Sequence, residues 1–364
     1  MKLGVVGLPN VGKSTLFNAI TKAGAESANY PFCTIEPNVG IVDVPDERLD
    51  ALTRLYNAKK TTPAQIEFVD IAGLVRGASH GEGLGNKFLS HIREVDAIIH
   101  VVRCFDDERI THVDGSVDPI RDIETINMEL MLADLESIDK YIEKETKLVK
   151  VGSATREHLV LLSTIKNVLE DGKTVRTLKL NDEQTEYVNS LFLLTSKPVI
   201  YVANIAEGDL LKNPNDIPYV AQVIQKANEE GAQVLPLSCK IEEELTALDS
   251  EEREMFKEEL GINKSGLEKL IVTSYKTLGL MSYLTAGEKE VRAWTIKIGT
   301  KAPQAAGKIH SDFEKGFIRA EIVKYDDLIS LGSINAVKEK GLMQSVGKEY
   351  VMQDGDVVLF KFNV

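Results

Sequence analysis

Cysteines, aromatic residues and long apolar runs are scarce in this sequence of 364 residues, in which aromatic residues make up 6%. The three cysteines, Cys33, Cys104 and Cys239, are unpaired in their spacing, which supports neither a disulfide framework nor a zinc site. No apolar run approaches the ~20 residues that a membrane span needs, and a strand-like segment stands where a signal peptide would begin. Internal repeats and low-complexity segments are also missing. We therefore expect a reduced, globular, cytoplasmic protein that makes no membrane contact.

A phosphate-binding loop follows the first apolar segment. Residues 7–14 read GLPNVGKS and fit the pattern G-x-x-x-x-G-K-[ST] between a strand and a helix. The two glycines of the pattern allow backbone N–H groups to curl around a phosphate, and the helix that follows directs its positive end at the anion. The lysine then reaches the β- and γ-oxygens, and the serine offers its hydroxyl to Mg²⁺. The expected nucleotide-binding residues here are Asn10, Val11, Gly12, Lys13, Ser14 and Thr15.

A second motif indicates a nucleotide switch. The apolar segment 66–69 ends in Asp70-Ile-Ala-Gly73, in which the aspartate can hold Mg²⁺ through a water and the glycine N–H can bind the γ-phosphate. Between the two motifs lies the proline-bounded loop 30–37, where Thr34 is the candidate for a second Mg²⁺ hydroxyl. The order and spacing of these segments predict a switch-type P-loop NTPase, with Lys13, Asp70 and Gly73 as catalytic groups and Ser14, Thr34 and Asp70 as metal ligands.

The residue that positions the attacking water is not evident. Leu74 stands where Ras-like proteins have a glutamine, and leucine cannot form a hydrogen bond to water. Losing such a group costs on the order of 10²–10⁴ in rate, so slow intrinsic hydrolysis is expected. His80 and His112 are candidates for the role, with a loop or packing role as the alternative for each.

The base-recognition loop departs from the guanine-specific pattern Asn-Lys-x-Asp. After the apolar segment 198–203 the chain reads Asn204-Ile205-Ala-Glu207, so the ring-stacking lysine is isoleucine and the aspartate is the longer glutamate. Guanine would be left with unpaired donors at about 1–3 kcal/mol each, which favours ATP over GTP. Adenine offers an N6 donor to the Asn204 side chain or to a main-chain carbonyl near Ile205. Ser238 opens the last loop expected to contact the base.

Together these segments resemble one family closely. GLPNVGKST, YPFCTIEPN, DIAGLVRGASHGEGLGN and NIAE, with KAPQAAGKIHSDFEKGFIRAE near the C-terminus, are similar to the YchF branch of the Obg-related P-loop NTPases, the Obg-like ATPases. The resemblance covers essentially the whole chain. It implies an ATP-preferring hydrolase of the translation-factor class with an OBG-type domain, a C-terminal β-grasp module called a TGS domain, and association with ribosomes in the cytosol.

The expected architecture is α/β, with a mostly parallel sheet. The OBG-type domain is placed at residues 1–279 and the TGS domain at 280–363. An insertion at about 128–196 is expected to form an antiparallel helical hairpin, because Met128, Met131, Leu135, Ile138, Ile142 and Val149 recur at helical spacing and a similar rhythm resumes from His158. This hairpin is either a solvated scaffold or an arm for a partner. Strands are expected at 291–298, 317–323 and 357–362.

Charge is distributed unevenly along the chain. Residues 280–364 carry 12 basic and 11 acidic side chains, whereas the preceding 279 carry 31 and 45. A basic face on the C-terminal module is therefore permitted, with a merely neutral surface as the alternative. The expected partners are ATP with Mg²⁺, a K⁺ ion beside Asn10, and the ribosome with its RNA, without DNA. We expect an ATPase switch; the alternatives are a GTPase of the same fold and a binding module that uses nucleotide only as a structural ligand.

Overall fold

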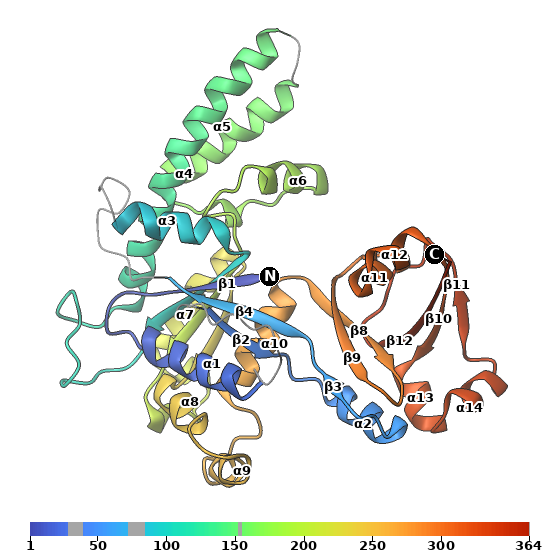
Figure 1. Ribbon diagram of the computed structural model, residues 1–364. Helices are drawn as coiled ribbons and strands as arrows, with labels where there is room; N and C mark the ends of the chain where they lie inside the picture. Colours follow the sequence, from blue (N-terminus) through green and yellow to red (C-terminus); the bar gives the residue numbers. More distant parts are fainter. Residues whose placement is uncertain (28–38, 72–83, 152–154, 364) are drawn as a thin grey trace. The chain divides into compact units, whose positions relative to one another are not determined.

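The computed structural model describes residues 1–27, 39–71, 84–151 and 155–363 (Figure 1). Packing divides the chain into two units, and each unit contains segments from distant parts of the sequence. Unit 1 comprises residues 1–41 and 67–269, and unit 2 comprises 42–66 and 270–364. In the described ranges, no helix is both long enough and apolar enough to cross a membrane.

Unit 1 is built on a six-stranded sheet in the order β2-β4-β1-β5-β6-β7. The pairs β1–β4, β1–β5, β5–β6 and β6–β7 are parallel, which confirms the predicted mostly parallel α/β fold. Strands β5 and β6 are buried along their whole length, as expected for central strands covered on both faces. Helix α1 packs on β1 and α8, while α4 packs on β5, and α7 on β6 and β7. The elements are β1 (Lys2–Val6), α1 (Lys13–Ser27), β2 (Val39–Asp43), β4 (Gln65–Asp70), α3 (Leu84–Glu94), β5 (Ala97–Arg103), α4 (Pro119–Lys150), α5 (Arg156–Glu170), η1 (Val175–Thr177), α6 (Asp182–Ser190), β6 (Val199–Asn204), η2 (Glu207–Asp209), η3 (Pro214–Asp216), α7 (Pro218–Glu230), β7 (Gln233–Leu237), α8 (Cys239–Leu245) and α9 (Ser250–Glu259). Helix α10 (Gly266–Thr277) begins in unit 1 and continues into unit 2.

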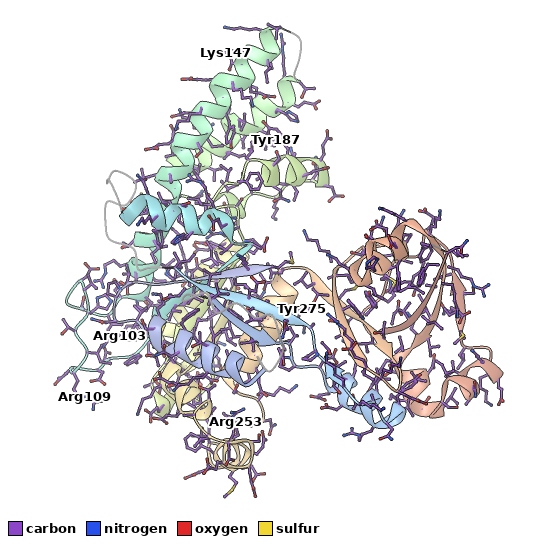
Figure 2. All side chains as sticks on the ribbon, viewed as in Figure 1. Arg103, Arg109, Lys147, Tyr187, Arg253 and Tyr275 are labelled. Carbon is purple, nitrogen blue, oxygen red and sulfur yellow. The ribbon has the colours of Figure 1, made fainter. Side chains whose placement is uncertain are left out.

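The predicted helical hairpin is formed by α4 and α5 (Figure 1). Helix α4 begins at Pro119, before the expected start, where the Asp118 side chain caps it by accepting a bond from the N–H of Arg121. Met128 does not belong to the packing seam: its side chain is 50% exposed, because the seam against α5 starts one helical turn later. The seam residues are Met131, Ile138, Leu161, Leu162, Ile165 and Leu169. Figure 2 shows Lys147 near the far end of α4 and Tyr187 on α6 beside the hairpin.

Unit 2 contains a mixed sheet in the order β11-β10-β12-β8-β9-β3. The three strands expected from the sequence are β9, β10 and β12, and the turn before β12 places Gly355 at φ 80°. Trp294, the single tryptophan, packs against the core of this unit, with its ring stacked on Tyr283 and the Arg292 guanidinium over it. The elements are α2 (Glu47–Tyr56), β3 (Thr61–Thr62), β8 (Leu280–Ala286), β9 (Val291–Lys297), α11 (Ala302–Ile309), α12 (Ser311–Lys315), β10 (Phe317–Lys324), α13 (Tyr325–Leu331), α14 (Ile334–Glu339), β11 (Gln344–Val346) and β12 (Asp356–Phe362).

The excursion 42–66 is a part of unit 2 that the sequence-based division at residue 279 does not include. Helix α2 buries Leu49 and Leu52, at 3% and 0% exposure, and contacts β8 and β9. Strand β3 then pairs in parallel with β9, where the N–H of Val291 donates to the carbonyl of Lys60 at 2.9 Å. The chain thus leaves the parallel sheet after β2, completes the edge of the second sheet, and returns along β4 to Asp70.

Candidate nucleotide-binding site

The phosphate-binding loop joins β1 to α1 as the motif predicts. Asn10 and Gly12 have positive φ values of 63° and 100°, and the first helical bond of α1 runs from the N–H of Leu16 to the carbonyl of Gly12 at 2.9 Å. A Cβ on Gly12 would lie 2.3 Å from the amide nitrogen of Asn204, so a side chain is excluded there by both backbone angle and space. The backbone angles and the close packing at Gly12 hold the loop in this curled form. Ser14 and Thr15 follow in the first turn of α1.

Lys13 and Asp70 form an ion pair at the end of β4. Their side chains are 13% and 25% exposed, so both remain within reach of a ligand at the surface of the loop. The pair brings together the predicted phosphate-binding cation and the predicted Mg²⁺-binding carboxylate from positions 57 residues apart. The Ser14 hydroxyl and the Asp70 carboxylate are hard oxygen donors, which is the ligand chemistry that Mg²⁺ prefers. Thr34, Gly73 and His80, also predicted for the site, lie outside the described residues.

Asn204 holds the phosphate-binding loop against the base-recognition loop. Its side-chain nitrogen donates to the carbonyl of Val11 at 2.8 Å, and its side-chain oxygen accepts from the N–H of Cys239 at 3.0 Å. Asn204 is only 5% exposed, and Val11 only 1%. Both ends of this amide are therefore engaged in joining two loops. With both of its polar atoms engaged, the Asn204 side chain braces the two loops.

The remaining base-loop residues differ in exposure. Ile205 is buried at 3%, and its N–H donates to the carbonyl of Leu237 at 3.0 Å. The Glu207 carboxylate is half exposed and pairs with the Lys240 ammonium, whose pKa it raises. Ser238 is buried at the start of α8. The loop therefore presents a buried aliphatic residue and a neutralised glutamate where a guanine-specific protein presents a lysine and a bidentate aspartate.

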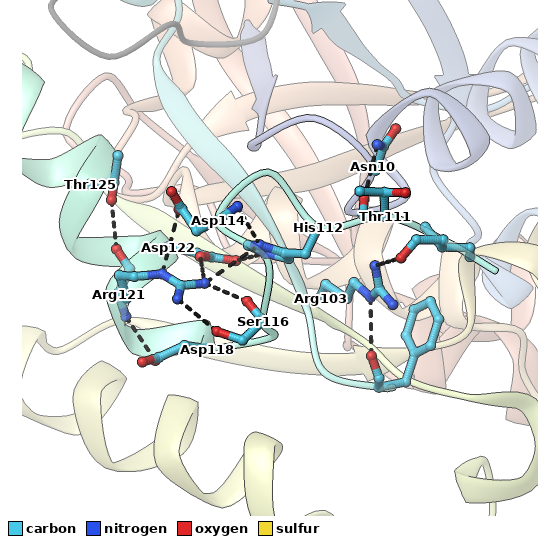
Figure 3. A network of polar contacts seen from close by, with 12 residues as sticks. Asn10, Arg103, Thr111, His112, Asp114, Ser116, Asp118, Arg121, Asp122 and Thr125 are labelled. Atoms are coloured by element: carbon cyan, nitrogen blue, oxygen red, sulfur yellow. Dashed lines mark hydrogen bonds and ion pairs between the residues drawn. The ribbon is translucent and has the colours of Figure 1, made fainter. Parts of the chain in front are cut away.

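His112 is held in a buried polar network (Figure 3). Its Nδ1 accepts from the N–H of Asp114 at 3.1 Å, so Nε2 carries the proton and donates to the Asp122 carboxylate at 2.8 Å. The Arg121 guanidinium contacts the other oxygen of Asp122 at 3.2 Å. His112 is 7% exposed and Asp122 is 1% exposed. A carboxylate thus fixes the ring and its tautomer, which is how an acid–base histidine is commonly oriented.

The loop that carries His112 is held by hydrogen bonds from Asn10 in the phosphate-binding loop and from Arg103 at the end of β5. The Asn10 side-chain nitrogen donates to the carbonyl of Thr111 at 3.1 Å, which ties the phosphate-binding loop to the residue before His112 (Figure 3). Arg103, at the end of β5, is 1% exposed and donates to the carbonyls of Phe105, Asp107 and Ile110 at 2.9–3.1 Å. One buried guanidinium therefore satisfies three carbonyl groups of this loop.

Sequence reasoning missed Arg103, Asp122 and Arg121. An arginine at the end of the strand Ala97–Arg103, which is apolar apart from His100, is a usable signal, because a buried arginine must find several acceptors. Asp122 lies on the first turn of α4 and carried no separate motif.

The described cysteines, Cys104 and Cys239, are free thiols at 1% exposure each. Burial raises the pKa of both thiols, which keeps them protonated and unreactive.

Comparisons with known proteins identify the family. A family model described as a 50S ribosome-binding GTPase matches residues 2–134, and a model named YchF-GTPase_C, described as a protein of unknown function (DUF933), matches 280–363. The ribosome-binding ATPase YchF of Bacillus subtilis is 59% identical over 362 residues, covering 99% of each chain. Obg-like ATPase 1 of Rattus norvegicus is 47% identical over 368 residues, covering 100% of this chain and 92% of the relative. The solved structure of the Schizosaccharomyces pombe YchF GTPase superposes with a TM-score of 0.89 at 45% identity, covering 99% of this chain and 97% of that one. At such identities over nearly its whole length, this chain belongs to the YchF family of Obg-like P-loop ATPases.

Proposed function

We propose that this chain binds ATP in preference to GTP, hydrolyses it slowly with Mg²⁺, and acts as a nucleotide-dependent switch on the ribosome. The observation that carries the nucleotide preference is the base loop, with Ile205 buried and Glu207 paired with Lys240. The names of the bacterial and rat relatives support an ATPase, and that of the bacterial relative supports a ribosomal partner, whereas the solved yeast relative is named a GTPase.

Guanine needs a carboxylate that accepts from both its N1–H and its exocyclic amine. The Glu207 carboxylate is one methylene longer than the usual aspartate and is engaged by Lys240. Each guanine donor left unpaired costs about 1–3 kcal/mol, or roughly one to two decades in affinity. Adenine requires only one acceptor for its N6 amine, which a main-chain carbonyl near Ile205 supplies.

Titration with fluorescent ATP and GTP analogues tests this preference. The double variant Ile205→Lys/Glu207→Asp restores the guanine-specific residues and is expected to shift the affinity ratio toward GTP. Glu244→Asp is the matched control, because Glu244 also contacts Lys240, at 3.8 Å, but lies outside the base loop. Equal or tighter GTP binding by the unmodified chain would refute the proposed preference.

In the proposed reaction, Lys13 neutralises the β- and γ-phosphate oxygens, and the N–H groups of the curled loop bind them. Bound Mg²⁺ would neutralise developing charge, and Ser14 and Asp70, with Thr34, are the residues that would hold it. Lys13 must leave Asp70 to reach the phosphates, which releases the carboxylate for its second role. Asn10 is proposed to face a K⁺ ion; equal turnover in K⁺ and Na⁺ would contradict that role.

His112 is the proposed water-positioning residue among those the structure describes. Leu74 cannot position the water, because its side chain forms no hydrogen bonds. The bond from the Asn10 side chain to the carbonyl of Thr111 holds the His112 loop beside the phosphate-binding loop. The bond between Nε2 and the Asp122 carboxylate holds the ring in a fixed orientation. His112 has to release its bond from Asp114 before Nδ1 can contact water, which agrees with slow intrinsic hydrolysis. His80 remains an alternative by sequence.

For the ribosome, unit 2 is the proposed contact. By composition, unit 2 carries 17 basic and 15 acidic residues, whereas unit 1 carries 26 and 41. Lys308, His310, Lys315 and Arg319 are all exposed on or beside α11, α12 and β10, although His310 contacts Asp312, and Arg319 contacts Glu321. Phosphate backbones would be repelled by unit 1 and tolerated by this face.

Sedimentation with ribosomes tests the contact in the full-length chain. Lys308→Glu/Lys315→Glu is expected to abolish pelleting at low salt with a non-hydrolysable ATP analogue. Lys144→Glu/Lys147→Glu, on the exposed side of α4, is the matched charge reversal on the helical arm. Pelleting should also fall by roughly one log unit per log unit of salt for each phosphate contact. If the unmodified chain stays in the supernatant, ribosome association is wrong; if only the arm variant fails, the contact lies on the arm.

A further inference from the structure

Helix α9 of unit 1, with the end of α8 and the turn between the two helices, lines an open groove. None of the predicted nucleotide-binding residues lines this groove. Its volume is about 810 Å³. In Figure 1, α9 lies at the opposite end of unit 1 from the α4–α5 hairpin. The apolar part of the groove is formed by the side chains of Ala247, Leu248, Met255 and Phe256. Met255 is 66% exposed, which leaves a large, flexible apolar side chain directed at solvent.

The polar part of the groove consists of carboxylates. It is lined by Glu244, Glu252, Glu258 and Glu259. The segment Cys239–Glu259 as a whole has nine acidic and three basic side chains.

Those three basic groups are already engaged. Lys240 pairs with Glu207 and also contacts the rim residue Glu244 at 3.8 Å, and Lys257 pairs with Glu254 at 2.6 Å. Arg253, labelled in Figure 2, donates to the carbonyls of Leu245 and Leu248 at 2.9 Å. The groove therefore presents a strongly negative rim around an apolar floor.

The walls of the groove are fixed by local bonds. The Asp249 carboxylate caps α9 by accepting from the N–H groups of Glu251 and Glu252 at 3.0 Å each, and Glu252 completes a capping box. The two Arg253 bonds close the turn between the helices. A preformed groove of this kind costs little ordering free energy when a partner binds.

We propose that this groove docks a basic, amphipathic polypeptide segment from a partner protein. Its lysine or arginine side chains meet the glutamate rim, and its large apolar side chains cover Met255 and Phe256. Nucleic acid is excluded by the sign of the rim charge, and an acidic or neutral partner would leave the carboxylates uncompensated. The proposal concerns a surface separate from the base loop and the basic face of unit 2, so it does not depend on the proposed ATPase or ribosome roles.

Fluorescence anisotropy with the full-length chain tests this docking. The probe is a labelled peptide of leucine and lysine, about 14 residues or four helical turns long, with leucine at helical spacing. A second peptide with alanine for every leucine keeps the charge and removes the apolar anchors. Glu258→Lys/Glu259→Lys is expected to weaken binding about tenfold, and Met255→Ser about fivefold with little dependence on salt. Both sites are on the surface, and urea denaturation checks that folding is unchanged.

Glu136→Lys/Glu143→Lys, on the exposed side of α4, is the matched control for a general effect of charge. It should bind the leucine–lysine peptide within twofold of the unmodified chain. The proposal is overturned if the peptide does not bind, if the alanine peptide binds equally well, or if the control variant weakens binding as much as the groove variant does. A concentration-dependent dimer that covers Met255 would also overturn it, by assigning the groove to a second copy of the chain.

Discussion

Replacing Asn204 with alanine tests whether one amide holds the nucleotide site together. The change removes the donor to Val11 and the acceptor for Cys239, two bonds of 2.8 and 3.0 Å between buried partners. Each buried backbone group left without a partner costs about 1–3 kcal/mol. We therefore expect a loss of about 2–6 kcal/mol in unfolding free energy for the two groups, together with weaker binding of every nucleotide, because the curled loop loses its support.

Asn204→Asp separates the bracing role from a base contact. Aspartate keeps an acceptor for Cys239 but places an oxygen against the carbonyl of Val11 and a negative charge beside the phosphates. It should therefore weaken ATP and GTP by a similar factor and leave their ratio unchanged. Urea denaturation followed by circular dichroism measures stability, and titration with fluorescent nucleotides measures affinity. Asn215→Ala, on the exposed η3 helix, is the control and should change stability by less than about 0.5 kcal/mol.

Two results would refute this reasoning. If Asn204→Ala unfolds within about 0.5 kcal/mol of the unmodified chain, the two bonds carry no net stability. If either variant changes the ATP-to-GTP ratio while phosphate binding is unaffected, Asn204 contacts the base, as the sequence first suggested.

Lys13→Ala should abolish turnover in a phosphate-release assay, and undiminished hydrolysis would place the site elsewhere. His112→Ala should lower kcat by about 10²–10⁴ with ATP affinity nearly unchanged, and an unchanged kcat would remove His112 from the mechanism. Arg103→Met should leave three loop carbonyls without their donor, lowering both thermal stability and kcat, whereas a fall in stability alone would limit Arg103 to a structural role. Burial lowers the pKa of His100 to about 3. Below pH ~6.5 the unfolded chain therefore binds a proton at His100 that the folded chain does not, and the free energy of unfolding should fall by about 1 kcal/mol per pH unit from pH 6 to pH 4. His100→Phe should flatten that slope in urea denaturation.

The parts of this site that sequence could predict are those set by local backbone chemistry. Gly12 adopts a positive φ and Lys13 begins a helix, and both features depend on neighbouring residues. The motif of eight residues is therefore enough to predict them. The hairpin is predictable because the apolar residues of its seam recur at helical spacing. The pattern nevertheless includes Met128, which lies one turn before the seam, since periodicity does not show where the partner helix ends. The Asn204 side chain bonds to Val11, 193 positions away in the sequence. No local pattern distinguishes an amide that contacts a base from one that connects two loops. Such a long-range hydrogen bond can be recognised only once the three-dimensional structure is known.

The excursion 42–66 changes how the role of unit 2 must be tested. Truncation after Leu278 would remove β8 and β9, against which α2 buries Leu49 and Leu52 and with which β3 pairs. The truncated chain would then expose this apolar face of α2, and a leucine fully withdrawn from water contributes about 1.5–3 kcal/mol. Loss of ribosome binding in such a fragment would be equally well explained by aggregation. Moreover, β2 and β4 cross from one unit to the other, and β4 ends at Asp70, so the fragment would also disturb the strand that carries the predicted Mg²⁺ ligand. Point reversals at Lys308 and Lys315 leave α2 and β4 intact, and only they attribute a loss of binding to surface charge on unit 2.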